Sequence, residues 1–293
     1  MQRWGDIAAA ISGATSSHFV VARATPMGGS NINHAFCVES ENGARYFVKL
    51  NKVDKHEMFA AERTGLQALA ATRTVRVPQA IAHGASGRHA FLVLEYLELK
   101  GGGNARLFGE QLAALHRTIA PKFGFACDNT IGLTLQPNGW KEEWIDFWRD
   151  RRLGFQLQLA ARNGHGGKLQ ALGARLLETL PHFFEGYTLQ PSLVHGDLWG
   201  GNHAYLSDGT PVIFDPAPYY GDREADLAMT ELFGGFDAEF YSAYRATCPL
   251  DAGYVVRKTL YNLYHILNHA NLFGGGYAQQ ATGLMQSLLS EAK

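Results

Sequence analysis

The octet HGDLWGGN at residues 195–202 is the feature of this sequence that most restricts its fold, because it interrupts a strand-like region. The apolar segment PSLV precedes it, and PVIF, which is immediately followed by Asp215, comes after the turn signal Asp208-Gly209. Asp and Asn are common in turns, and Asp197, Asn202 or Asp215 would each be ordinary alone. Three such residues, each beside a predicted strand, indicate a functional site.

A second candidate group lies upstream, in the segment YFVKLN. The apolar residues that share one face of this predicted strand are Tyr46, Val48 and Leu50. Lys49 lies on the opposite face, and taken alone it is equally well explained as a solvated lysine. In the predicted helix 54–71, however, Glu62 lies within an apolar stripe. Because an unpaired buried carboxylate is costly, we expect Glu62 to pair with Lys49, with Glu57 as the second choice.

The tetrad GGSN at residues 28–31 separates the first two predicted strands. Glycine lets backbone N–H groups approach an anion closely, although such a tetrad alone is typical of plain turns. The candidate phosphate-binding residues are Gly28, Gly29 and Ser30. Together with Lys49 and Glu62, this loop resembles the nucleotide-holding lobe of a kinase. The downstream order of the three polar residues resembles a kinase catalytic loop followed by a metal-binding aspartate.

The sequence after Asp215 leaves no room for a long peptide-binding segment. Within a few residues it reaches GDREADLAM, a predicted helix start. The acceptor is therefore expected to be a small molecule or an exposed side-chain adduct. Asp226 in this helix is either an N-cap or a brace for the catalytic loop. We expect the ring of His195 to brace the same loop by hydrogen bonds.

Patterning along the chain predicts an α+β, two-lobed, protein-kinase-like fold. Residues 1–97 form an antiparallel-sheet lobe with one inserted helix, which we expect to bind the nucleotide. Residues 98–293, after the glycine-rich connector, form a larger, mainly helical lobe for catalysis and acceptor binding.

Composition narrows the class of protein. The formal net charge of −1 gives no preference for nucleic acid, and no apolar run is long enough to cross a membrane. The three cysteines are far apart and odd in number, as expected of a cytoplasmic protein without a disulfide framework.

Four segments carry a resemblance to a known family. They are LVHGDLWGGN at 193–202, PVIFDPAPYYGDREADLAM at 211–229, ELFGGF at 231–236 and LYNLYHILNHANLFGGGY at 260–277, and FGFACDNTIGLTLQPNGW at 123–140 is one of the segments that support them. On these segments the chain resembles the fructosamine kinase (ketosamine-3-kinase) family, within the aminoglycoside and choline phosphotransferase-like group. His-Gly-Asp followed by Asn five residues after the Asp marks only the phosphotransferase superfamily. Trp199, the Phe-Asp-Pro and the Leu-Asn-His near the C-terminus narrow the resemblance to this family. Asn31 stands where many members have a cysteine, so no redox switch is expected there.

The resemblance implies ATP-dependent phosphorylation of the C3 hydroxyl of a ketoamine, the Amadori product of a sugar and an amine. The acceptor is then a small-molecule ketoamine or a glycated lysine side chain, and decay of the unstable 3-phosphate releases the amine, which is deglycation. It also implies Asp197 as proton acceptor, Asn202 and Asp215 as Mg²⁺ ligands, and Lys49 with Glu62 as the phosphate-holding pair. The adenine is expected at the hinge backbone of Glu95, Tyr96 and Leu97.

Acceptor recognition is assigned to two places. The predicted helix 254–272 places Tyr261, Tyr264, His265 and Asn268 on one otherwise apolar face. That face either recognises hydroxyl groups or packs in the core with internal hydrogen bonds. His265 and Asn268 are its candidate substrate residues, and Trp199 is expected to flank the acceptor from the catalytic loop.

Two other functions remain open from the sequence. One is an aminoglycoside- or choline-type kinase, although a cationic acceptor usually requires an acidic pocket and the C-terminal helix offers His265 and Asn268 instead. The other is a nucleotide-binding pseudokinase, although such proteins generally lack the base or a metal ligand, and here every one of these residues is present.

Overall fold

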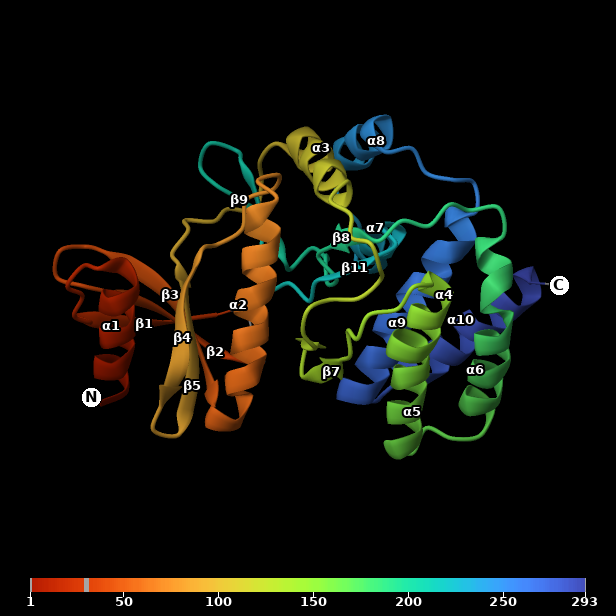
Figure 1. The fold of residues 1–293 in the computed structure, drawn as a ribbon, viewed down its shortest axis with the longest axis horizontal. Coiled ribbons are helices and arrows are strands. Elements are labelled where there is room, and N and C mark those ends of the chain that lie inside the picture. Colours follow the sequence, from red (N-terminus) through yellow and green to blue (C-terminus); the bar gives the residue numbers. More distant parts are fainter. Residues whose placement is uncertain (1, 29–31, 293) are drawn as a thin grey trace. The chain divides into compact units, whose positions relative to one another are not determined.

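The computed structural model describes residues 2–28 and 32–292, which form two compact units (Figure 1). The first unit is Met1–Asn104 with Ala204–Pro216, and the second is Ala105–His203 with Ala217–Lys293. Within the described ranges, no helix has both the length and the apolar character needed to cross a membrane.

An antiparallel five-stranded sheet, in the order β1-β2-β3-β5-β4, forms the centre of the first unit. Its strands are β1 Arg23–Met27, β2 His34–Glu39, β3 Arg45–Lys52, β4 Ala80–Ser86 and β5 His89–Glu95. The predicted turn at Asn42-Gly43 joins β2 to β3, and Gly43 has a φ of 83°, which glycine adopts without strain.

Two long helices cover opposite faces of this sheet (Figure 1). They are α1 Gln2–Thr15 and α2 His56–Ala71, the latter preceded by a 3₁₀ turn over Val53–Lys55. Val48 and Leu50 of β3 are buried in an apolar cluster with Ile7 of α1. Lys49 faces the other way, toward Glu62 of α2. The predicted alternation along β3 and the single inserted helix are thus confirmed.

The segment 204–216 packs with the first unit, although it lies far along the chain. It contains most of a hairpin of β9, His203–Tyr205, and β10, Pro211–Ile213. The backbone N–H of Lys100 donates to Tyr205 at 2.8 Å, and that of Ile213 donates to Arg76 at 3.0 Å. The predicted turn is present, with Gly209 at a φ of 89°. The division of roles at residues 97 and 98 remains a prediction.

The second unit is mainly helical, as predicted, with α9 packed against α5, α7 and α10, and α3 packed against α8. Its helices are α3 Ala105–His116, α4 Trp144–Phe147, α5 Gly154–Arg162, α6 Lys168–Thr179, α7 Glu224–Leu232, α8 Ala238–Thr247, α9 Tyr254–Phe273 and α10 Tyr277–Glu291. A π-helical turn over Trp148–Leu153 separates α4 from α5, and a 3₁₀ turn over Leu180–Phe184 follows α6.

The second unit also contains short strands, one of which leads directly into the octet. They are β6 Asn129–Ile131, β7 Thr134–Gln136, β8 Ser192–Val194 and β11 Tyr219–Gly221. β8 pairs with β11, so that Val194, the last residue before the octet, lies opposite Tyr219. The octet therefore begins where a fully buried strand ends.

Candidate active site

Lys49 lies between two carboxylates in the first unit. Its Nζ is 2.5 Å from Oε1 of Glu62 and 2.6 Å from Oδ1 of Asp215. The predicted pair of Lys49 with Glu62 is therefore present. Glu57, the second choice, is almost fully exposed and approaches His56 instead.

The charge state of this group follows from its surroundings. Burial acts to lower the pKa of Lys49, but the carboxylates of Asp215 and Glu62 outweigh it, so the pKa is raised. Burial raises the pKa of Glu62, and the attraction of Lys49 opposes that rise. The side chain of Asp215 is 41% exposed, so one carboxylate of the group reaches solvent while the lysine does not. The group presents a buried cation with a solvent-accessible carboxylate oxygen beside it.

Asp215 has an unusual backbone conformation. Its φ is 56°, in the left-handed region that few residues other than glycine, Asn and Asp adopt. Such conformations cost free energy and concentrate at functional sites. Here the conformation directs the carboxylate toward Lys49, immediately after β10.

The other predicted nucleotide contacts are only partly described. Gly29 and Ser30 lie outside the described residues, and Gly28 is exposed at the end of β1. At the predicted hinge, the backbone N–H of Glu95 donates to Gln79, and its carboxylate accepts two bonds from Arg76 at 2.5 and 2.6 Å. Gly28, Gly29 and Ser30 remain predicted phosphate contacts. Glu95, Tyr96 and Leu97 remain predicted contacts of the adenine.

In the loop 195–202 of the second unit, side chains form hydrogen bonds with other residues of the same loop. The amide nitrogen of Asn202 donates to the backbone oxygen of Asp197 at 2.8 Å and to its carboxylate at 3.2 Å. Gly196 has a φ of 82°, and a Cβ there would collide with the carbonyl oxygen of Ala217. The backbone N–H of Asp197 donates to Nδ1 of His195 at 3.3 Å, which is the bracing role predicted for that ring.

Asp226 of α7 holds the base of this loop. Its Oδ2 accepts the backbone N–H of His195 at 2.6 Å, and its Oδ1 accepts that of Gly196 at 2.8 Å. His116 of α3 donates to Oδ2 from Nε2 at 3.1 Å. Burial acts to raise the pKa of Asp226, but these bonds outweigh it and the pKa is lowered. Of the two predicted roles, the brace is confirmed and the N-cap is wrong, since Asp226 lies inside the helix.

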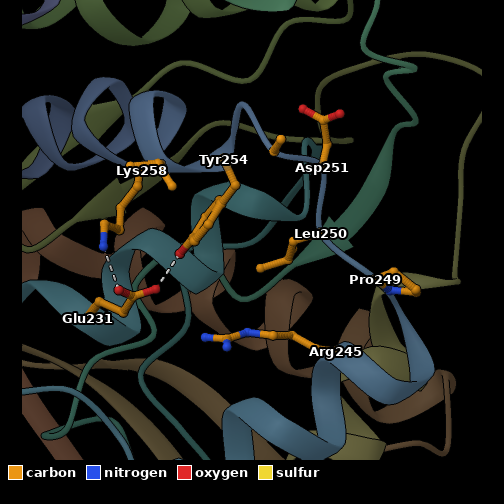
Figure 2. Close-up of a pocket in the computed structure, with 9 residues that line it drawn as sticks. Glu231, Arg245, Pro249, Leu250, Asp251, Tyr254 and Lys258 are labelled. Carbon is orange, nitrogen blue, oxygen red and sulfur yellow. Dashed lines mark hydrogen bonds and ion pairs between the residues drawn. The ribbon is translucent and has the colours of Figure 1, made fainter.

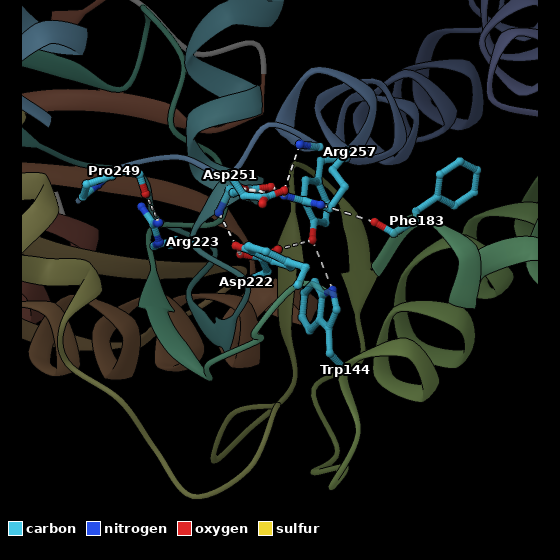
Figure 3. Close-up of polar contacts among 11 residues, drawn as sticks. Trp144, Phe183, Asp222, Arg223, Pro249, Asp251 and Arg257 are labelled. Atoms are coloured by element: carbon cyan, nitrogen blue, oxygen red, sulfur yellow. Dashed lines mark hydrogen bonds and ion pairs between the residues drawn. The ribbon is translucent and has the colours of Figure 1, made fainter. Parts of the chain in front are cut away.

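α7 is itself bonded to α9 near both ends. In its first turn, Glu224 accepts bonds from Arg257 at 2.7 and 3.1 Å, within the buried polar network that Figure 3 shows around Arg257. In its last turn, Glu231 accepts bonds from Tyr254 at 2.6 Å and Lys258 at 2.7 Å, and all three residues line the pocket drawn in Figure 2. These contacts limit the movement of the helix that carries Asp226.

Trp199 extends from the catalytic loop with 39% of its surface exposed. Its ring lies edge-on to that of Phe233, with ring centroids 6.2 Å apart. A Cβ on Gly201 would collide with the indole, so a larger residue there would have to displace the ring. Trp199 is thus a half-exposed aromatic surface two residues from Asp197.

Tyr264 and Asn268 of α9 are buried and hydrogen-bonded to other segments of the second unit. Tyr264 donates to Gln136 at 2.7 Å, and Asn268 donates to the carbonyl of Ile131 at 3.3 Å. His265 is 4% exposed and Asn268 is 3% exposed. These contacts are those of the core-packing alternative, and hydroxyl recognition by His265 and Asn268 remains a prediction that they do not support.

The burial of His265 predicts acid sensitivity. Burial, and more weakly His269, lower the pKa of His265 to about 3, whereas an unfolded histidine titrates near pH 6.5. The unfolded chain therefore binds more protons between these values, so this stability is complete above pH 6.5 and is lost as pH falls toward 3. Urea denaturation at pH 7 and at pH 4.5 measures how much stability each protein loses on acidification. We expect the loss in free energy of unfolding to be about 2 kcal/mol smaller in His265→Gln than in wild type. His18→Gln, at an exposed position, is the control, and equal acid sensitivity in all three proteins would contradict this account.

His116 is a functional residue that sequence reasoning missed. It is buried, and its other ring nitrogen lies 2.7 Å from the hydroxyl of Tyr244. The available signal was a histidine at the end of an otherwise apolar helix face. Its partner Asp226 is 110 residues away, and no local spacing connects the two.

The sheet with one inserted helix, followed by a helical unit with the braced Asp–Asn loop, is the fold of kinase-like phosphotransferases. An aminoglycoside phosphotransferase shares this fold, with a TM-score of 0.56 at 16% identity over 97% of this chain and 98% of that chain. The fructosamine kinase family matches residues 3–291, and the chain belongs to this family, as its motifs indicate.

Individual relatives agree with that membership. A "Probable ketoamine kinase" from Synechocystis sp. is 48% identical over 290 residues, which cover 98% of this chain and 97% of that protein. "Protein-ribulosamine 3-kinase, chloroplastic" from Arabidopsis thaliana is 40% identical over 271 residues, covering 91% and 82%. The crystal structure of a candidate fructosamine-3-kinase from Haemophilus somnus is 29% identical with a TM-score of 0.89, covering 98% and 97%.

Proposed function

We propose that this chain is an ATP-dependent ketoamine kinase that phosphorylates the 3-hydroxyl of fructosamine- or ribulosamine-type Amadori products. Family membership over nearly the whole chain supports the substrate class. The observation that carries the phosphotransferase assignment is the buried Lys49 bonded to both Glu62 and Asp215. A buried lysine held in this way contacts phosphates in kinases, and the glutamate orients it.

The reaction is a single transfer. The C3 hydroxyl oxygen of the acceptor forms a bond to the γ-phosphorus of ATP as the bond from that phosphorus to the β-bridging oxygen breaks, and ADP leaves. The hydroxyl proton passes to the carboxylate of Asp197. Asn202 and Asp226 position this carboxylate, the former by its amide and the latter through the loop backbone. The 3-phosphate then decays and releases the amine, so the net outcome is deglycation.

Mg²⁺ fits the oxygen donors present. Asp215 supplies a partly exposed carboxylate, and Asn202 is oriented by two bonds from its amide nitrogen, which supports its amide oxygen as the proposed ligand. Mg²⁺ is commonly held by one or two protein oxygens together with substrate phosphates and water. When bound, the ion neutralises phosphate charge during transfer.

The acceptor is expected beside Trp199. Half-exposed aromatic rings bind the apolar faces of ring compounds while leaving hydroxyl groups to polar partners. The position of Trp199, two residues after Asp197 and packed on Phe233, supports its role in flanking the ketoamine. Both free ketoamines and glycated lysine side chains satisfy this chemistry.

The test is ADP release from Mg-ATP with ribulose-lysine, fructose-lysine, an aminoglycoside, choline, or no acceptor. We expect ADP release that depends on the ketoamines, accompanied by an acid-stable or decaying phosphosugar detected by mass spectrometry. Turnover with only the aminoglycoside or choline would replace the proposed substrate. ATP binding without any acceptor-dependent turnover would favour the pseudokinase alternative.

Glu62→Gln tests the role of the lysine pair. The amide keeps the shape but removes one of the two carboxylates that orient Lys49, a charged hydrogen bond worth about 2 kcal/mol. We expect kcat/KM for ATP to fall about tenfold or more. Glu57→Gln, on the exposed side of α2, is the matched control. Unchanged kcat/KM and stability in Glu62→Gln would show that the pair does not orient Lys49.

A further inference from the structure

Arg152 is a fully buried arginine that has no carboxylate partner among the described residues. Its Nη1 donates to the carbonyl of Pro137 at 2.7 Å, and its Nη2 donates to Oδ1 of Asn138 at 2.7 Å. The other buried arginine, Arg257, instead forms an ion pair with Glu224 at 2.7 Å. Because burying an unpaired charge opposes folding, Arg152 is a poor choice for filling a core.

The position of Arg152 is also unusual. It lies in the π-helical turn Trp148–Leu153, and such turns occur often at functional sites. The guanidinium carbon is 4.0 Å from the ring centroid of Tyr219 and 4.6 Å from that of Phe147. A planar cation is stabilised on aromatic faces in this way, which a lysine ammonium would do less well.

One contact of Arg152 leads to the strand before the catalytic loop. Tyr219 belongs to β11 and lies opposite Val194 of β8. The next residue, His195, is the first of the octet. The stacked guanidinium therefore supports the strand pair from which the loop emerges.

The other contact leads to the same loop by a second route. The segment 136–138, whose last two residues accept bonds from Arg152, begins with Gln136. The amide nitrogen of Gln136 donates to the carbonyl of Ala217 at 3.0 Å. The N–H of Ala217 in turn donates to the carbonyl of His195 at 2.9 Å. Arg152 thus joins two supports of the loop base.

We propose that Arg152 is a positioning residue for phosphoryl transfer, whose planar guanidinium bridges segment 136–138 and Tyr219 and thereby fixes the loop that carries Asp197. The inference rests on the proposed function, because it concerns the turnover of that site. On this proposal the buried cation lowers the stability of the fold and is present because it supports catalysis. Functional sites often contain residues that are unfavourable for stability.

The experiment compares Arg152→Met, Arg152→Lys and the control Trp148→Phe. Methionine removes the buried charge but keeps most of the apolar volume, so we expect Tm to be unchanged or raised. We expect kcat to fall about 10- to 100-fold with KM for ATP within about twofold, because small displacements of a catalytic group cost this much. Lysine keeps the charge but cannot bridge two acceptors in one plane, so it should not restore kcat. Trp148 lies in the same π-helical turn, and its substitution should leave kcat near the wild-type value.

Backbone hydrogen exchange provides a readout that needs no acceptor. In Arg152→Met we expect faster exchange confined to residues 192–202, with α10 unchanged. A lower Tm with normal kcat, rescue of kcat by lysine, or faster exchange throughout the second unit would each overturn the proposal. Absence of ketoamine turnover in wild type would defeat the proposed function alone, since the exchange result would still decide whether Arg152 holds the loop.

Discussion

Asp197→Asn is expected to reduce kcat about 10²- to 10⁴-fold while ATP affinity stays within a few-fold of wild type. The amide preserves the shape of the carboxylate, and the bond from Asn202 to the backbone oxygen of residue 197 is unaffected. The amide, however, cannot accept the hydroxyl proton of the acceptor molecule as the carboxylate does. Binding of ATP, which the loss of this base does not remove, is measured by calorimetry, and turnover by ketoamine-dependent ADP release.

Asp208→Asn is a suitable control for that experiment. Asp208 is an exposed aspartate in the β9–β10 turn, where its side chain accepts a bond from the N–H of Thr210. Asparagine is equally favoured in such turns, so its turnover should match wild type. Near-normal kcat in Asp197→Asn would exclude Asp197 as the proton acceptor. Loss of ATP binding together with kcat would assign it to nucleotide binding instead.

Asp226→Asn should destabilise the second unit by about 3–5 kcal/mol and also abolish most turnover. The carboxylate accepts the backbone N–H of His195 on Oδ2 and that of Gly196 on Oδ1, and these two groups can only donate; Nε2 of His116 also bonds to Oδ2. An asparagine would place its own NH₂ against at least one of these buried donors. Because both backbone donors are buried, the one that faces the NH₂ group bears the full cost of an unmade bond.

Urea denaturation and ADP release on the same preparations measure this prediction. Asp54→Asn, an exposed aspartate of the first unit, is the control and should be stable and active. Full stability with low activity would mean that the loop rearranges without cost to folding. Full stability with full activity would contradict the bracing role.

Local periodicity predicted much of the first unit. Alternation along β3 separated Lys49 from Val48 and Leu50, and the 3.6-residue period of α2 placed Glu62 on the buried stripe. The resulting pair is present at 2.5 Å. That Asp215 is the second partner of Lys49 could not be read from spacing, because the two residues are 166 positions apart.

The same periodicity could not decide the role of α9. Polar residues at helical spacing on an apolar face look alike whether they line a binding site or satisfy one another in a core. His265 and Asn268 were candidate substrate residues on that pattern. Asn268 donates to the carbonyl of Ile131 and accepts a bond from Gln156, as the core-packing alternative expects, and both partners lie in distant segments.

The sequence by itself determined the strand and helix faces, the turns at Asn42-Gly43 and Asp208-Gly209, the Asp197 loop and the family. The faces and turns depend on backbone preferences and burial patterns that act over a few residues. The Asp197 loop and the family are recognised from short motifs, which are also local in the sequence. Tertiary structure alone decided that residues 204–216 pack with the sheet, that His116 holds Asp226, and that Arg152 is buried with no carboxylate partner in the described part of the chain. Such contacts depend on which distant segments the folded chain brings together, and the free energy that selects them is shared by the whole core.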